Sequence, residues 1–263
     1  MAGSEQGWWQ GQKAALVIAH PGHELRVHHW MEIARPLVLV LTDGSGHLDA
    51  GRLDRTAAVL AGAGASPSAN FFGKMPDREL YRAILAGEME TFRTLADEIA
   101  TTLANEEIDY VAADAVEGFN PGHDVCRLLV NAALATLRDR HGRDLPNLEF
   151  PLEAATLKRQ TRDGIELHLD AGALDRKLRA VDNYPELTEE ADRLRAAHGM
   201  ASFGVERLTP VNYLLDISDC SEQPPAYERW GEERVKSGYY KTVLRFTEHV
   251  EPIARQLAKR VIV

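Results

Sequence analysis

Residues 14–24 read AALVIAHPGHE, and this stretch decides the fold. Its first six residues form an apolar run with β-branched members and no polar alternation. A short run of this kind is typical of a strand that is buried on both faces of a parallel sheet. A loop follows, and residues 24–35 have the length of a helix that Pro36 would stop. The stretch therefore predicts a strand, a loop and a helix in succession.

The same alternation continues along the first half of the chain. The apolar pattern predicts further strands at residues 37–42, 71–72 and 108–113. It predicts helices at residues 54–61, where Gly62 and Gly64 would end the helix, and at residues 78–105 and 125–138. This order indicates an α/β fold, Rossmann-like and doubly wound, with a mainly parallel sheet.

The second half of the chain is less regular. Residues 154–160 and 165–169 flank an Arg-Asp-Gly turn and predict a hairpin. Residues 173–197 predict a helix that is interrupted near Pro185, and residues 239–260 predict a closing helix. We expect a single domain over residues 1–263. Its α/β core, residues 13–140, would carry the functional site, and residues 141–263 would elaborate the substrate pocket.

Composition excludes several classes of protein. The 263 residues carry a formal net charge of −10, which argues against a nucleic-acid partner or an anionic membrane surface. Two cysteines exclude a disulfide framework and a zinc site made of several thiolates. Residues 1–12 lack the apolar core of a signal peptide, and no apolar run is long enough to cross a bilayer. We expect a soluble, cytoplasmic protein that acts on a small molecule, and a homo-oligomer is compatible with the sequence.

Two histidines follow the first strand directly. His20 ends the strand and His23 opens the next helix. Loops at the carboxyl ends of parallel strands share one rim of a doubly wound sheet, and ligands bind there. Two imidazoles at this spacing can converge on one metal ion, although a capping or packed histidine pair would give the same pattern.

A third histidine is expected at the same rim. Residues 117–124 read EGFNPGHD after a predicted strand, and they place His123 at the start of a helix. The fold brings this loop near His20 and His23. Three nitrogen ligands leave one coordination position for water or substrate, which is the arrangement of catalytic zinc. We therefore expect Zn²⁺, with Fe²⁺ or another divalent transition metal as the alternative.

The motifs at this rim resemble a known family. Residues 19–24, AHPGHE, resemble the Ala-His-Pro-Asp-Asp-Glu signature of the PIG-L/LmbE-like N-acetylglucosaminyl deacetylases. Supporting matches cover most of residues 13–140 and extend weakly to later segments; they are residues 41–44, 52–65, 75–77, 117–123, 177–184 and 203–206. The resemblance implies a Rossmann-like, zinc-dependent amidohydrolase. It suggests hydrolysis of an N-acyl or related C–N bond on a small polar metabolite such as an amino sugar.

The chain departs from the family at the groups that move protons. Gly22 and His23 stand where the family has its general base and a carboxylate zinc ligand. Asn120 and Gly122 stand where it has a transition-state-stabilising histidine and a supporting aspartate, and only His123, a metal ligand in the family, matches. The resemblance therefore implies the metal ligands His20, His23 and His123 without the usual base.

Four residues at the rim are candidate catalytic groups. Asp43, Glu117 and Glu24 could each replace the missing base. Each could instead have a structural role. Asp43 could shape its turn, Glu117 could orient a histidine, and Glu24 could cap a helix or hold its loop. Asn120 occupies the position that the family uses for transition-state stabilisation.

Three residues are candidates for substrate binding. His47 follows the loop that begins after the predicted strand at residues 37–42. Arg52 could bind an anionic or sugar substrate. Tyr184 lies near the position of the family's tyrosine that supports the developing oxyanion.

Two other functions remain open from the sequence. Loss of the usual base is compatible with a repurposed, non-hydrolytic metalloenzyme, for which iron would be a fitting metal. It is also compatible with a non-catalytic binding protein of the same fold.

Overall fold

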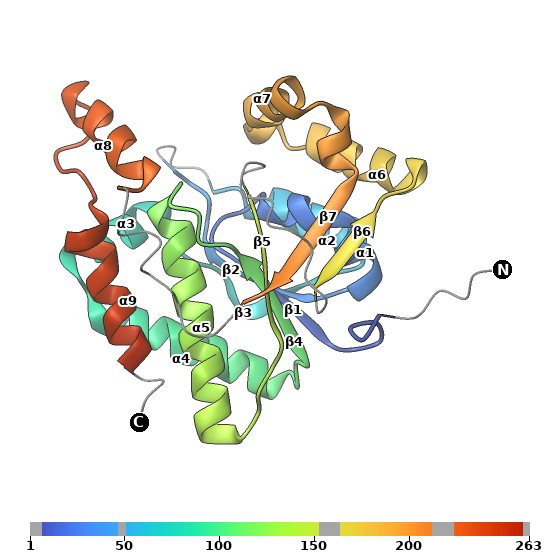
Figure 1. Ribbon diagram of the computed structural model, residues 1–263, viewed down its shortest axis with the longest axis horizontal. Coiled ribbons are helices and arrows are strands. Elements are labelled where there is room, and N and C mark those ends of the chain that lie inside the picture. Colours follow the sequence, from blue (N-terminus) through green and yellow to red (C-terminus); the bar gives the residue numbers. More distant parts are fainter. Residues whose placement is uncertain (1–6, 47–50, 153–163, 212–223, 260–263) are drawn as a thin grey trace.

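The computed structural model describes residues 7–46, 51–152, 164–211 and 224–259. Seven strands form one sheet in the order β3-β2-β1-β4-β5-β7-β6 (Figure 1). The first five in this order are parallel, β7 is antiparallel to β5, and β6 is antiparallel to β7. The strands are β1 Ala14–Ile18, β2 Leu37–Thr42, β3 Ser66–Met75, β4 Tyr110–Asp114, β5 Asn147–Phe150, β6 Ile165–His168 and β7 Val205–Pro210.

Helices cover both faces of the sheet. On one face, Val17 and Leu39 join a buried cluster with residues of α3, α4, α5 and α9. On the other face, Leu16 and Ile18 pack with α1 and α2. The helices are α1 His28–Ala34, α2 Leu53–Ala63, α3 Asp77–Ala86, α4 Met89–Asn105, α5 Pro121–His141, α6 Ala171–Asp182, α7 Thr188–His198, α8 Ala226–Lys236 and α9 Glu251–Ala258. The predicted α/β doubly wound fold is confirmed.

Strand order reverses at β1, which lies between β2 and β4. The connections that leave β1 and β4 therefore go to opposite faces of the sheet. A crevice opens at such a switch point beyond the carboxyl ends of the strands, and this is where open α/β sheets bind ligands.

The C-terminal half covers one side of this crevice. Helices α6 and α7 lie above the β7–β6 edge in Figure 1. Val181 of α6 and Ala191 of α7 pack with Tyr184 and with Leu25, which lies in the 3-10 turn between β1 and α1. None of the helices in the described ranges is both long and apolar enough to span a membrane.

Several predicted helix boundaries were wrong. The single helix over residues 78–105 is two helices, because Gly87 takes a left-handed backbone (φ 63°) that ends α3. Residues 23–27 form a 3-10 turn before α1. The closing helix begins only at Phe246, as a π turn before α9. Conversely, Gly62 lies inside α2, and Gly64 ends that helix.

Only the second arm of the predicted hairpin lies within the described residues. Residues 165–168 form β6 and pair with β7, which is about 40 residues further along the chain. Residues 154–160 lie outside the described ranges. Strands β5 and β7 and helix α8 are additions to the predicted set, whereas the break between α6 and α7 near Pro185 was predicted correctly.

Two glycines provide a matched test of this backbone assignment. An added Cβ would meet nothing within 4 Å at either Gly62 or Gly87, but only Gly87 has a left-handed φ. We expect Gly62→Ala to raise the free energy of unfolding by about 0.5–1 kcal/mol and Gly87→Ala to lower it by about 1–2 kcal/mol. Denaturant unfolding monitored by circular dichroism measures both, and equal effects of the two substitutions would contradict the assignment.

Candidate functional site

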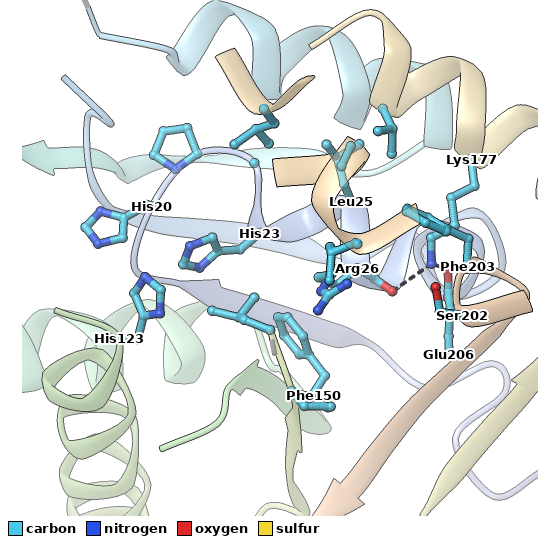
Figure 2. Close-up of a pocket in the computed structure, with 18 of the residues that line it drawn as sticks. His20, His23, Leu25, Arg26, His123, Phe150, Lys177, Ser202, Phe203 and Glu206 are labelled. Atoms are coloured by element: carbon cyan, nitrogen blue, oxygen red, sulfur yellow. Dashed lines mark hydrogen bonds and ion pairs between the residues drawn. The ribbon is translucent and has the colours of Figure 1, made fainter. Parts of the chain in front are cut away.

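Three histidines meet at the switch point. His20 follows β1, His23 begins the 3-10 turn, and His123 lies in the first turn of α5. Their ring centroids are 5.4 Å apart for His20 and His23, 5.1 Å for His20 and His123, and 4.4 Å for His23 and His123. Figure 2 shows the three rings together at one end of a pocket.

His20 is held through one ring nitrogen. Its Nδ1 lies 2.7 Å from Thr42 Oγ1 at the end of β2 and 2.9 Å from Asp77 Oδ1 at the start of α3. Burial, the largest single effect, would raise the pKa of Asp77, but the hydrogen bond and charge interaction with His20, together with hydrogen bonds from Thr42 and Gly46, hold the pKa well below its usual range. The other ring nitrogen, Nε2, is buried and has no hydrogen-bond partner. A histidine held in this way leaves Nε2 available to coordinate a metal ion.

His23 is held in the same manner by a different carboxylate. Its Nδ1 lies 2.9 Å from Asp114 Oδ2, at the end of β4. The same oxygen accepts a hydrogen bond from the Ala19 backbone N–H at 2.8 Å. Burial raises the pKa of Asp114 to about 7. A carboxylate behind the ring is the usual partner of a metal-ligating histidine, because it fixes the tautomer.

The start of α5 positions His123. Asn120 caps this helix by accepting a hydrogen bond from the Gly122 N–H at 2.7 Å, and Pro121 occupies the first turn. The Nδ1 of His123 is buried without a hydrogen-bond partner. Burial is the largest cause that lowers the pKa of His123 and of His23, followed by repulsion from neighbouring histidines. Both imidazoles are therefore neutral at pH 7, the form that binds metals.

The donor set fits a transition metal in its chemistry. Imidazole nitrogens without partners, neutral rings and carboxylates behind two of the rings are features of such sites. The rings themselves contact one another edge to face. As they stand, no group of three or more His, Cys, Asp or Glu side chains within the described ranges is arranged to hold a metal ion. The site thus offers the right ligands but not a closed coordination sphere.

The histidines line one end of a cavity of about 280 Å³. The opposite end is closed by a buried ion pair, in which Lys177 Nζ lies 2.8 Å from Glu206 Oε1. Lys177 also donates to the Arg26 carbonyl (Figure 2). Glu206 accepts from the backbone N–H groups of His29 and Trp30. This network ties α6 and β7 to the segment that follows His23.

A side chain at Gly22, which the family resemblance implies, would have to displace Leu187. The φ of Gly22 is 108°, a left-handed conformation, and an added Cβ would lie 2.6 Å from Leu187 Cδ1. Leu187 belongs to the turn between α6 and α7. The space beside the histidines that a catalytic carboxylate would need is therefore filled by an apolar side chain.

None of the three candidate bases lines the cavity. Asp43 accepts from the backbone N–H groups of Ser45 and Asp77 and so shapes its loop. Glu117 accepts from the Leu152 N–H. Glu24 is buried, accepts from the Gly22 N–H, and has a pKa raised to about 7 by burial. Asp43 and Glu24 thus hold their loops, as their structural roles require, whereas Glu117 holds the backbone at Leu152.

The remaining candidates divide between cavity and core. Asn120 and Arg52 line the cavity. Arg52 Nε donates to the Gly44 carbonyl, and Asn120 Oδ1 accepts from the Tyr81 hydroxyl. Tyr184 is fully buried away from the cavity, with its hydroxyl 3.3 Å from Thr56 Oγ1. His47 lies outside the described residues.

Sequence reasoning missed the groups that hold the histidines. Thr42, Asp77 and Asp114 each stand where a strand ends or a helix begins, so their positions gave a usable signal. Lys177 and Glu206 fall in weakly matching segments, but nothing in the sequence showed that they pair, and Leu187 gave no signal. Their roles depend on how the C-terminal half folds back onto the first loop.

Comparisons with known proteins find likeness only in structure. No family model matches the sequence, and no curated protein matches it. A triple mutant of a deacetylase from the teicoplanin biosynthetic pathway is 15% identical, with a TM-score of 0.49 over 76% of this chain and 99% of its own. The conserved protein TT1542 from Thermus thermophilus is 17% identical, with a TM-score of 0.48 over 79% and 98% of the two chains. Likenesses of this size assign no function to the chain.

The crowding at Gly22 leads to a direct test by substitution. We expect Gly22→Ala and Gly22→Asp to lower the free energy of unfolding by more than Gly87→Ala does. Both positions carry the left-handed backbone cost of about 1–2 kcal/mol, but only Gly22 also meets Leu187. Denaturant unfolding measures the difference. A Gly22→Ala variant no less stable than Gly87→Ala would show that Leu187 leaves space for a side chain there.

Proposed function

We propose that this chain is a metal-dependent hydrolase, with zinc as the expected metal. Its substrate would be an N-acyl or related C–N bond of a small polar metabolite such as an amino sugar. The observation that carries the proposal is the meeting of three histidines at the switch point, where His20 Nε2 and His123 Nδ1 are buried without partners. The resemblance of residues 19–24 to the deacetylase signature points to the same chemistry.

His20, His23 and His123 would hold the ion. A divalent ion with an open position supplies Lewis acidity, which polarises an acyl carbonyl and lowers the pKa of water. Asp77 and Asp114 keep the Nδ1 side of two rings occupied, so that the opposite nitrogens face the site. These two carboxylates are positioning residues in this account.

The side chains that line the cavity are compatible with a reaction that uses no fixed carboxylate base. Among the described residues that line it, Glu206 is the one carboxylate, and it is paired with Lys177 at the far end. Three neutral ligands leave the charge of a bound ion uncompensated, which lowers the need for a separate base. Asn120 and Arg52 line the same cavity and are candidates to contact the amide and the polar part of the substrate.

A non-catalytic binding protein of the same fold is the second candidate. The filling of the space beside Gly22 by Leu187 and the open arrangement of the three rings favour it. A repurposed, non-hydrolytic metalloenzyme would instead bind iron and turn over with oxygen, so the identity of the metal separates it from the hydrolase.

Metal content and turnover test the proposal together. We expect the purified protein to bind about one equivalent of zinc per chain and to release acetate from an N-acetyl amino sugar. His20→Ala and His123→Ala should abolish both, because each removes one of three ligands. His168→Ala is the matched control, since this side chain is 72% exposed and pairs with Glu166 away from the cavity. The proposal fails if the alanine variants retain full metal content.

The carboxylates behind the rings allow an independent test. We expect Asp114→Asn to weaken zinc binding about 10–100-fold while the protein stays folded, because an amide fixes the His23 tautomer less strongly. Competition with a chromophoric chelator measures the affinity, and circular dichroism checks the fold. Asp139→Asn, on the surface of α5, serves as the control. Unchanged zinc affinity in Asp114→Asn would mean that His23 is not a ligand.

A further inference from the structure

The cavity continues past the histidines into an apolar arm. We define this arm by six of its lining residues: Leu25, Val181, Leu187, Ala191, Leu194 and Phe203. Figure 2 shows Leu25 and Phe203 beside the pocket, on the side away from His20 and His123. The arm and the histidines belong to one cavity, so a ligand can occupy both ends at once.

The arm is built into the fold. Leu25, Val181 and Ala191 belong to one buried hydrophobic cluster that joins the first rim loop to α6 and α7. Phe203 is buried, and the Arg195 guanidinium lies 5.9 Å from the centre of its ring. The Lys177–Glu206 ion pair fixes α6 and β7 to the backbone near Arg26. A wall held in this way is preformed, which is usual for ligand sites.

The cavity offers both polar and apolar contacts. Arg52 and Asn120 line it together with the three histidines. The six residues of the arm are aliphatic or aromatic, and polar residues line the cavity beside them, among them Ser202 and the mutually paired Lys177 and Glu206 (Figure 2). A hydrocarbon chain can contact the six apolar side chains, while the polar part of a substrate lies at the histidine end.

The size of the cavity exceeds what an acetyl group needs. About 280 Å³ is near the lower end of the range for cavities that hold whole small ligands. An acetyl group beside the histidines would leave the arm unfilled. Each methylene that enters the arm gains the free energy of leaving water.

We propose that the arm binds an aliphatic acyl chain of several carbons, so that the preferred substrate is a medium-chain N-acyl amine rather than an N-acetyl amine. This inference rests on the proposed function for the reaction, although binding of the chain does not need turnover. Hydrolysis would consume one water per amide, break the C–N bond, and release the fatty carboxylate and the free amine.

Binding of a chain-length series tests the arm directly. Isothermal titration of the full-length protein with N-acetyl-, N-butanoyl- and N-octanoyl-glucosamine should show affinity rising up to about fourfold per methylene. We expect octanoyl to bind at least about tenfold more tightly than acetyl, because part of the chain stays near the solvent. Equal affinities for acetyl and octanoyl would overturn the proposal.

Variants of α7 locate the chain. Leu194→Asp places a charge in the arm, and we expect it to remove the advantage of octanoyl over acetyl while N-acetylglucosamine binds as before. Arg193→Asp is the matched control, because Arg193 does not line the cavity. Ala191→Phe, which fills the arm, is the second variant in case Leu194→Asp is unstable. The proposal is overturned if both folded variants keep the full chain-length preference.

Turnover of the same series by the zinc-loaded protein separates the two proposals. Tighter binding of octanoyl without hydrolysis of any member supports the arm and refutes the hydrolase. Hydrolysis of N-acetylglucosamine with no dependence of binding or kcat/KM on chain length supports the hydrolase and refutes the arm.

Discussion

The carboxylate of Asp114 joins the two strands between which the sheet reverses. From the end of β4, its Oδ2 accepts the Ala19 N–H at the end of β1 and faces His23 Nδ1 on the loop that follows. This one group fixes the first rim loop to the neighbouring strand and sets the orientation of a candidate ligand. The helix that carries His123 begins a few residues after Asp114, so the same strand also places the third histidine. A buried carboxylate is costly without hydrogen bonds, and here the N–H and the imidazole supply them to Oδ2, whereas Oδ1 is buried without a partner.

The electrostatics of the site follow from this packing. Burial and mutual repulsion lower the pKa values of His23 and His123, so three rings can lie in contact without three positive charges. Asp77 performs for His20 the task that Asp114 performs for His23. A cluster of imidazoles with buried, unpartnered nitrogens is unfavourable as a purely structural element, because each such nitrogen forgoes a hydrogen bond. Metal binding would supply the missing interaction.

The sequence predicted the part of the fold that depends on local pattern. Apolar runs located β1, β2 and β4, and the rule for open α/β sheets placed His20, His23 and His123 at one rim. The split of residues 78–105 at Gly87 was missed because the apolar periodicity continues through the break. Tertiary contacts could not be predicted from the sequence. Nothing near Gly22 in the sequence shows that Leu187, over 160 residues later, fills the space beside it. Likewise, the burial of Tyr184 against Thr56 depends on how α6 and α7 dock.

If the three histidines bind one metal ion, zinc K-edge X-ray absorption of the zinc-loaded protein should show scattering from three imidazoles and one lighter oxygen ligand. The imidazole contribution should be reduced in His123→Ala. A spectrum that indicates hydrated or loosely bound zinc, unchanged by the substitution of His123, would contradict binding by the three histidines.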